Sequence, residues 1–149
     1  MRYSSDILQL ALPVGTVLVI VVLLGGCELL GLGSSSELSG STWQLTSFTE
    51  NEQPLVVPPQ QTYEVSFSDE SVGAVADCNE CSGSYSTDGS EISILISCTE
   101  QACASNSLSL QFKNALLSAE TYQREEGQLT ISYSLSQESG GTLTFEPKE

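Results

Sequence analysis

The stretch QLTISYSL, residues 128–135, alternates polar and apolar side chains at every position. Leu129, Ile131, Tyr133 and Leu135 share one face, and polar side chains occupy the other. A period of two is typical of an antiparallel strand with one face toward a core and one toward water. The same alternation recurs at residues 42–46, 63–68, 92–97 and 142–145, with shorter strands expected at 72–76 and 84–87. The sequence therefore predicts a mainly β (α+β) domain of about seven or eight antiparallel strands.

Turn residues separate these strands. The pairs Asp88-Gly89, Glu126-Gly127 and Gly140-Gly141 each contain glycine, which adopts the positive φ angles of tight hairpin turns. The segment Asp88-Gly-Ser-Glu91 lacks the spacing of a calcium-binding loop. We therefore interpret it as a hairpin turn.

One segment, Asn106–Ala119, has a helical rather than a strand period. Its apolar residues lie three or four positions apart, at Leu108, Phe112, Ala115, Leu116 and Ala119. This spacing predicts a single amphipathic helix that covers an open side of a curled sheet, with Ser105 or Asn106 as its N-cap. Leu110 and Leu117 widen the apolar stripe. We expect both to be buried, and the alternative is an exposed apolar patch that binds a partner.

Composition excludes several classes of function. The chain has 149 residues, enough for one domain, and its 19 acidic against 4 basic residues give a net charge of −15. Binding to nucleic acid is not expected, because phosphate neutralisation requires Lys and Arg. The chain contains no His, which removes Ser-His-Asp and Cys-His mechanisms. No spacing of carboxylates indicates hydrolase chemistry, and we expect no cofactor and no metal site.

The first part of the chain resembles a targeting signal. An uncharged apolar stretch from Ile7 to Gly26 ends in Leu24-Gly25-Gly26-Cys27. Small residues before a cysteine are typical of a lipoprotein signal, whose cysteine thiol receives the lipid. We predict a signal peptide over residues 1–26, a lipidated Cys27 with a flexible tether over 27–41, and the folded domain over 42–147. The alternative is an uncleaved membrane anchor. Either interpretation places the domain outside the cytoplasm, at the cell envelope, attached to a membrane.

The four remaining cysteines admit three interpretations. Cys78, Cys81, Cys98 and Cys103 could form a zinc site, a redox pair or two disulfides. An extracytoplasmic location favours disulfides. Local pairing within each motif stays possible. We favour the nested pairing Cys78–Cys103 and Cys81–Cys98, which fits two adjacent segments that run in opposite directions.

These motifs also carry a family resemblance. The chain resembles the META domain family, which includes HslJ-like heat-shock lipoproteins, over about Ser41 to Phe145. The motif residues that carry the resemblance are Trp43, Cys78, Asn79, Gly83, Tyr85, Thr99, Cys103, Phe112 and Leu116. The resemblance implies a small β-barrel-like domain with one helix, supports Cys78–Cys103 as the older bond, and implies an association with stress. Asp77 and Glu100 depart from the family pattern, which has Gly and a basic residue at these two positions in many members.

The expected function is binding rather than catalysis. We expect a stress-associated envelope lipoprotein that binds an unknown envelope protein or an apolar ligand near the helix. One alternative is an inhibitor-like acidic module that binds a basic enzyme through complementary charge. The other is a carboxylate-dependent hydrolase. An apolar groove under the helix would favour the binding lipoprotein, and a protruding acidic loop would favour the inhibitor-like module. A pocket ringed by carboxylates would favour the hydrolase.

Overall fold

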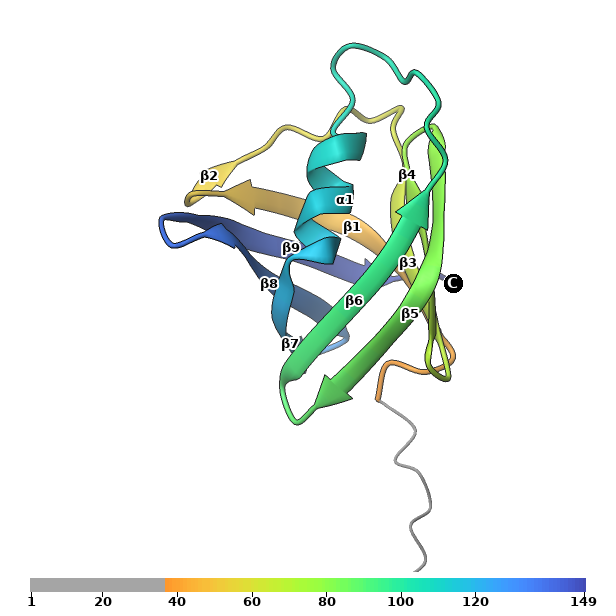
Figure 1. Cartoon of the computed structure of the whole chain (residues 1–149), viewed down its shortest axis with the longest axis vertical. Helices are drawn as coiled ribbons and strands as arrows, with labels where there is room; N and C mark the ends of the chain where they lie inside the picture. The colour runs from red at the N-terminus through yellow and green to blue at the C-terminus, as the bar shows by residue number, and fades with distance from the viewer. Residues whose placement is uncertain (1–36) are drawn as a thin grey trace, which may run out of the picture. The chain divides into compact units, whose positions relative to one another are not determined.

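The computed structural model describes residues 37–149, which form a closed antiparallel β-barrel with one helix (Figure 1). Adjacent strands pair antiparallel throughout, and pairing of the first strand with the last closes the barrel. The predicted mainly β fold is confirmed. The elements are β1 Ser41–Glu50, β2 Gln53–Pro54, β3 Tyr63–Ser68, β4 Ser71–Ala76, β5 Asn79–Asp88, β6 Glu91–Cys98, α1 Ser109–Leu117, β7 Ala119–Glu125, β8 Gln128–Ser136 and β9 Ser139–Pro147.

The barrel is weakly closed at one seam. β6 pairs with β7 only at Glu91↔Thr121, whereas it pairs with β5 along its whole length. The helix α1 lies beside the remainder of β6, in the seam between β6 and β8 (Figure 1). Phe112, Ala115 and Leu116 are the buried residues of α1. The helix therefore covers the open side of the sheet, as the amphipathic pattern predicts.

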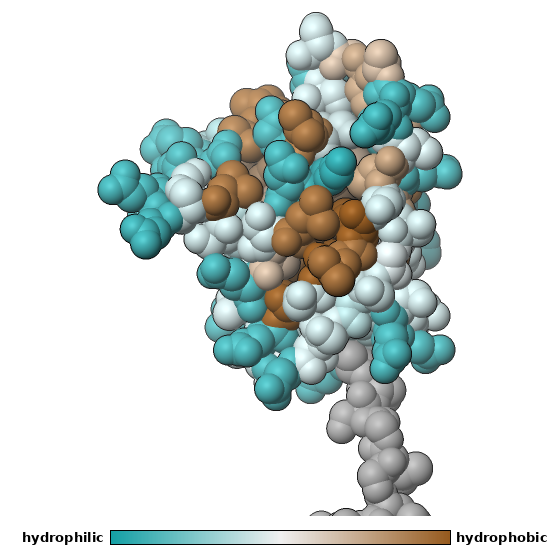
Figure 2. Space-filling model, in the orientation of Figure 1, coloured by the Kyte–Doolittle hydropathy of each residue, from teal (hydrophilic) through white to brown (hydrophobic). Residues whose placement is uncertain are grey.

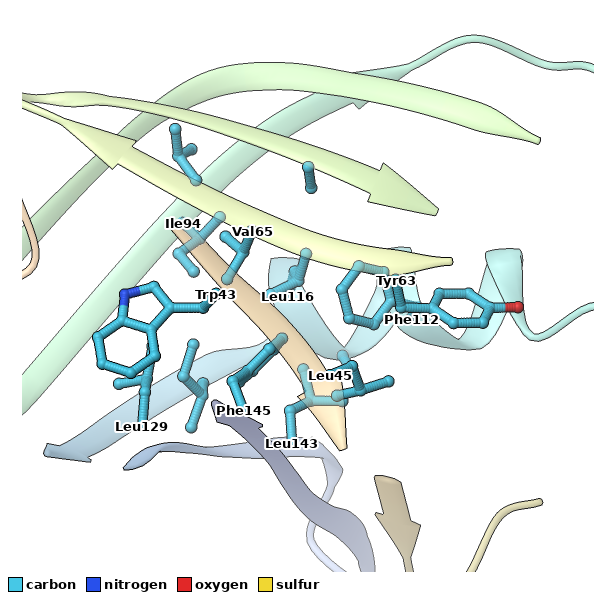
Figure 3. Close-up of a cluster of buried hydrophobic side chains, with 14 of the residues drawn as sticks. Trp43, Leu45, Tyr63, Val65, Ile94, Phe112, Leu116, Leu129, Leu143 and Phe145 are labelled. Atoms are coloured by element: carbon cyan, nitrogen blue, oxygen red, sulfur yellow. The ribbon is translucent and has the colours of Figure 1, made fainter. Parts of the chain in front are cut away.

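Aromatic packing centres on the helix (Figure 3). The ring of Phe112 meets Tyr63 edge-on at a centroid distance of 5.2 Å, Phe145 at 6.3 Å and Phe48 at 6.5 Å. Edge-to-face pairs of this kind add stability beyond the area that they bury. Each of these four rings is almost fully buried. Phe112 therefore joins α1 to three adjacent strands of the barrel, β9, β1 and β3.

The helix begins later than predicted. Asn106, an expected N-cap, instead accepts a hydrogen bond from Gln61 Nε2 at 3.2 Å. The N–H of Leu108 donates to the Tyr63 hydroxyl at 2.8 Å. These contacts to the region of β3 hold residues 106–108 outside the helix, which begins at Ser109 without a side-chain cap.

The end of the helix was also predicted too late. Ala119, expected on the helical stripe, is the first residue of β7. In β7 only Tyr122 is buried, so the strand lacks the alternation that would have indicated it.

The pair Gly140-Gly141 does not form the predicted turn. Both glycines lie within β9, and the hairpin reverses over residues 137–138, between Ser136 and Ser139. The close approach of the neighbouring strands explains why these two positions are glycine. A Cβ on Gly141, for example, would lie 1.9 Å from the carbonyl oxygen of Thr49. The Glu126-Gly127 turn is as predicted, with positive φ at both residues.

The packed domain begins before Ser41. Leu38, expected in the tether, is 0% exposed and belongs to the core. Arg124 lies over the Trp43 ring at 5.4 Å from its centroid and donates to the carbonyl oxygen of Glu37 at 2.9 Å. Cys27, the expected signal segment and most of the expected tether lie outside the described residues. Within residues 37–149, no helix has the length and apolar character needed to cross a membrane.

Candidate functional site

Two disulfides join the end of β4 and the start of β5 to the end of β6 and the loop that follows it. Cys78 bonds to Cys103 and Cys81 bonds to Cys98, with Cα–Cα distances of 5.5 Å and 4.0 Å. This is the nested pairing favoured from the sequence. All four sulfur atoms are used in these S–S bonds, so none is left as a zinc ligand, and Cys78 and Cys81 do not form a local C-x-x-C redox pair.

Asn79 organises the loop that precedes α1. Its Oδ1 accepts hydrogen bonds from the Gln101 N–H at 2.7 Å and from Thr99 Oγ1 at 3.0 Å. Its Nδ2 donates to Ser109 Oγ at 3.1 Å and to the Gln101 carbonyl oxygen at 3.3 Å, and lies 3.2 Å from Cys103 Sγ. The side chain is 7% exposed. One buried amide thus connects β5, the loop and the first turn of α1.

The other residues that carry the family resemblance support the fold. The glycine at position 83 allows close strand pairing, because a Cβ there would lie 1.8 Å from the Leu95 carbonyl oxygen. Tyr85 packs edge-on against Phe67 at 4.8 Å. Trp43 and Leu116 are buried in the core. The structure therefore gives these residues packing contacts, with Thr99 placed beside Asn79.

A hollow of about 310 Å³ lies between this loop and α1. Its lining includes Asn79, Glu100, Cys103, Ser109, Leu110 and Lys113. Among the basic side chains of residues 37–149, Lys148 pairs with Glu64 and Arg124 lies over Trp43. Lys113 has no ion pair within the described residues. The hollow thus combines one available cation with polar groups and one edge of an apolar surface.

We give the name α1–β6 patch to the exposed leucines of these two neighbouring elements, which are Leu95, Leu110 and Leu117. Leu95 is 66% exposed, Leu110 is 64% exposed and Leu117 is 39% exposed. The broadest brown area in Figure 2 covers the region where α1 and β6 lie in Figure 1. The expectation that Leu110 and Leu117 are buried is therefore wrong. Because Phe112, Ala115 and Leu116 already fill the seam, the wider stripe has no further core to pack against.

An acidic hollow lies at the other end of β6. It measures about 520 Å³ and is lined by the β5–β6 hairpin and the start of β7. Asp88, Glu91 and Glu120 are its charged lining residues. Asp88 and Glu91 pair across the hairpin, with Gly89 at φ 56° in the turn, as the sequence predicts. Among residues 37–149, no three Cys, Asp or Glu side chains converge to hold a metal ion.

The titrating groups with perturbed pKa values are two tyrosines in the core. Burial raises the pKa of Tyr63, whose hydroxyl donates to Gln61 Oε1 at 2.7 Å. Burial, followed by the charge of Glu50, raises the pKa of Tyr133 to about 12. The Tyr133 hydroxyl donates to the Thr49 carbonyl oxygen at 2.8 Å. Both hydroxyls hold structural hydrogen bonds.

Comparison with known families identifies the fold. The model of the META domain matches residues 36–149, which include every described residue. The chain belongs to the META domain family. No curated protein matches it in sequence.

Two solved structures resemble this META domain. An NMR structure of a protein from Burkholderia xenovorans has a TM-score of 0.59 at 20% identity, covering 74% of this chain and 83% of that one. A crystal structure of a DUF4847 family protein from Bacteroides vulgatus has a TM-score of 0.54 at 14% identity, covering 78% of this chain and all of the other, at 100%. At these identities the likeness shows a shared fold.

Sequence reasoning missed one member of the candidate site, Leu95. It lies on the polar face of β6 between Ser93 and Ser97, where the alternation predicts a third small polar residue. The sequence did contain a signal for this residue, because Leu95 is apolar at a position where the alternation requires a polar side chain. The META domain thus presents an apolar surface that two separate elements build together.

Proposed function

We propose that this META domain protein is a non-catalytic, lipid-anchored protein of the cell envelope that binds a partner protein through the α1–β6 patch. The observation that carries the proposal is the exposure of Leu95, Leu110 and Leu117 on neighbouring elements. Single exposed leucines are ordinary, whereas grouped ones mark interaction sites. Apolar residues on a solvent face contribute little to folding, so binding gives them a role.

The location outside the cytoplasm rests on two features of the chain. Disulfides persist in oxidising compartments, and the domain has two of them. The Leu24-Gly25-Gly26-Cys27 motif follows an apolar stretch of signal length. A lipid on Cys27 would hold the domain at the membrane surface, where a partner could reach the patch. The association with stress is carried over from the family resemblance as part of the same proposal.

The non-catalytic part of the proposal rests on the available side chains. The sequence has no His, and the hydroxyl groups of Ser107 and Ser109 near the hollow have Lys113 as their neighbouring base. Lys113 is partly exposed on α1, and the two hydroxyls bond to Tyr63, Asn79 and the Ser109 N–H rather than to it. Neither hydroxyl is therefore activated as a nucleophile.

Site-specific photocrosslinking in the cell envelope tests the binding surface. A benzophenone amino acid at Leu110 or Leu117 should give crosslinks to a specific protein. The matched control is Val56, which is equally apolar and 84% exposed but lies in the loop after β2. Replacing Leu95 by Glu should abolish the crosslinks from Leu110 without lowering the melting temperature, because Leu95 is outside the core.

Two results would contradict the proposal. Crosslinks from Leu110 and Leu117 that are no stronger than those from Val56 would show that the patch has no partner. Saturable hydrolysis of an envelope polymer that disappears when one carboxylate is replaced would show that the protein is an enzyme.

A further inference from the structure

The exposed face of α1 carries a cation between two leucines. Leu110, Lys113 and Leu117 are spaced at i, i+3 and i+7, so their side chains lie along one face of the helix. Lys113 also lines a hollow together with Cys98, so it lies on the flank of α1 that faces the end of β6. The lysine is partly exposed, and within residues 37–149 its ammonium group pairs with no carboxylate. The α1–β6 patch therefore lies beside one positive charge that is available to a partner.

Carboxylates border the patch at both ends of β6. Glu91 is the first residue of the strand, on the same face as Leu95, and Glu100 lies two positions after the end of the strand. At about 3.3 Å per residue, Glu91 and Leu95 are roughly 13 Å apart, which is within the area that a typical partner covers. Glu120, which follows α1, lines the acidic hollow together with Glu91. A protein that covers the leucines therefore also meets these carboxylates.

Charge identifies the kind of partner. With 19 acidic against 4 basic residues, the chain repels acidic proteins, anionic lipid headgroups and a second copy of itself. A two-fold dimer through the patch would also place the acidic borders of the two copies close together, since both ends of the patch are acidic. A basic protein is attracted by the same charges, and complementary charge raises its rate of association.

Lys113 adds a second requirement. An ammonium group that a partner covers loses its hydration, which is costly unless an opposite charge takes the place of the water. A wholly apolar contact face would leave Lys113 buried and unpaired, whereas a face with one carboxylate among its apolar side chains would pair with it. The lysine thus discriminates between apolar surfaces that the leucines alone would bind equally well.

We propose that the α1–β6 patch binds a basic protein whose contact face carries apolar side chains, one carboxylate opposite Lys113 and basic side chains opposite Glu91 and Glu100. This inference rests on the proposed function and specifies the chemistry of the partner. The leucines supply the apolar contact, Lys113 fixes the orientation, and the bordering carboxylates attract the partner.

Photocrosslinking from position 117 in the cell envelope tests the role of Lys113. The full chain, with the benzophenone amino acid in place of Leu117, is expressed at a low level with and without Lys113→Met, which removes the charge but keeps a stem of similar length. Crosslinks to the specific partner should fall about fivefold to tenfold, because the carboxylate of the partner loses its counter-ion. Unchanged or stronger crosslinks would mean that the partner presents an apolar face to Lys113, and would overturn the proposal.

Lys148→Met is the matched control. Lys148 follows β9 and pairs with Glu64, so this variant changes the net charge equally at a site outside α1. Its crosslinks from position 117 should equal those of the protein without it, and both lysine variants should keep their melting temperature. Equal losses from the two variants would assign the effect to net charge and contradict the pairing of Lys113.

A double charge reversal tests the acidic border. Glu91→Lys with Glu100→Lys should reduce the crosslinks about tenfold, whereas Glu125→Lys with Glu138→Lys, at the end of β7 and in the β8–β9 turn, should reduce them by less than about twofold. Added salt in isolated membranes should also weaken the crosslinks, because it screens the attraction. Equal effects of the two reversals, or stronger crosslinks after reversal of the border, would overturn the basic partner.

The inference and the proposed function fail in different ways. Specific crosslinks from Leu110 and Leu117 that do not respond to the Lys113 and border variants would keep the patch as a binding surface and overturn the chemistry assigned to its partner. Crosslinks no stronger than those from Val56 would remove the proposed function, and this inference with it.

Discussion

The side chain of Asn79 uses both its carbonyl oxygen and its amide nitrogen in the interior. It contacts Thr99, Gln101 and Cys103 on a loop with few apolar side chains of its own, and Ser109 in the first turn of α1. A loop of this composition cannot be held by hydrophobic burial. Hydrogen bonds to one buried amide therefore determine how the chain leaves β6 and enters α1.

Replacing Asn79 by Ala should destabilise the domain by roughly 2–3 kcal/mol, because the Gln101 N–H and the hydroxyl groups of Thr99 and Ser109 lose the buried amide that they bond to. Urea unfolding with intact disulfides measures this change. The control is Asn114→Ala, at an exposed position of α1, for which little change is expected. Equal stabilities of the two variants would mean that Asn79 does not hold the loop.

The Tyr133 hydroxyl makes stability depend on alkaline pH. Its pKa is raised from 10.0 to about 12 by burial and by Glu50, so the folded state retains the phenol proton that the unfolded state releases. Stability is then complete below pH 10 and falls as pH rises toward 12. Melting temperatures of the wild type and of Tyr133→Phe should therefore converge over this interval. Parallel curves would contradict the assigned role.

At the scale of elements, the two disulfides differ in what they hold. Cys81–Cys98 links positions that already pair in the β5–β6 ladder, whereas Cys78–Cys103 ties the loop before α1 to the barrel. The closed loops span 17 and 25 residues. Chain entropy alone assigns each bond about 3 kcal/mol when it acts singly. Because the bonds are nested, each restrains a shorter loop when the other is present.

Two double variants, each with one disulfide replaced by alanines, distinguish these roles. Cys78→Ala with Cys103→Ala should lower the free energy of unfolding by about 2–3 kcal/mol and speed amide exchange in residues 99–108. Cys81→Ala with Cys98→Ala should lower stability by a similar amount while that loop stays protected. Hydrogen exchange read by mass spectrometry distinguishes the two. The same exchange pattern in both variants would refute the division.

The elements that sequence could predict are those whose side chains follow one period. Strands β3 and β6 alternate because one face is buried along their length, and β8 does so as far as Tyr133, beyond which Leu135 is exposed. β7 was missed because only Tyr122 in it is buried. The first residues of the helix were misassigned because Gln61 and Tyr63 bind Asn106 and Leu108 from another part of the chain. Such tertiary hydrogen bonds leave no periodic signal.

The candidate site was only partly predictable for the same reason. The compartment predicted disulfides, the nested pairing was the preferred one of three connectivities, and the apolar helix positions were visible in the sequence. Their exposure depends on how much of the seam Phe112 and Leu116 already fill. The place of α1 beside β6 depends on β7 leaving β6 after one residue pair, which is a property of the three-dimensional arrangement.

At the scale of the whole molecule, net charge and attachment are linked. The chain has a net charge of −15, and a surface this acidic is repelled by anionic lipid headgroups. The proposed attachment to a membrane therefore requires either a covalent lipid or a retained apolar span. A diacylglycerol on Cys27 supplies two acyl chains, and two chains are what stable anchoring requires.

We therefore predict that residues 1–26 are removed and that Cys27 carries lipid. The mature chain would have 149 − 26 = 123 residues. Intact-mass analysis of membrane-extracted protein should show this length plus a diacylglycerol, and high salt should not release the protein. Cys27→Ser should leave an unprocessed precursor or a soluble domain. Since Cys27 is separate from both disulfides, the variant should keep its melting temperature. A free Met1 or an unmodified Cys27 in the wild-type protein would show that the apolar segment is a retained span.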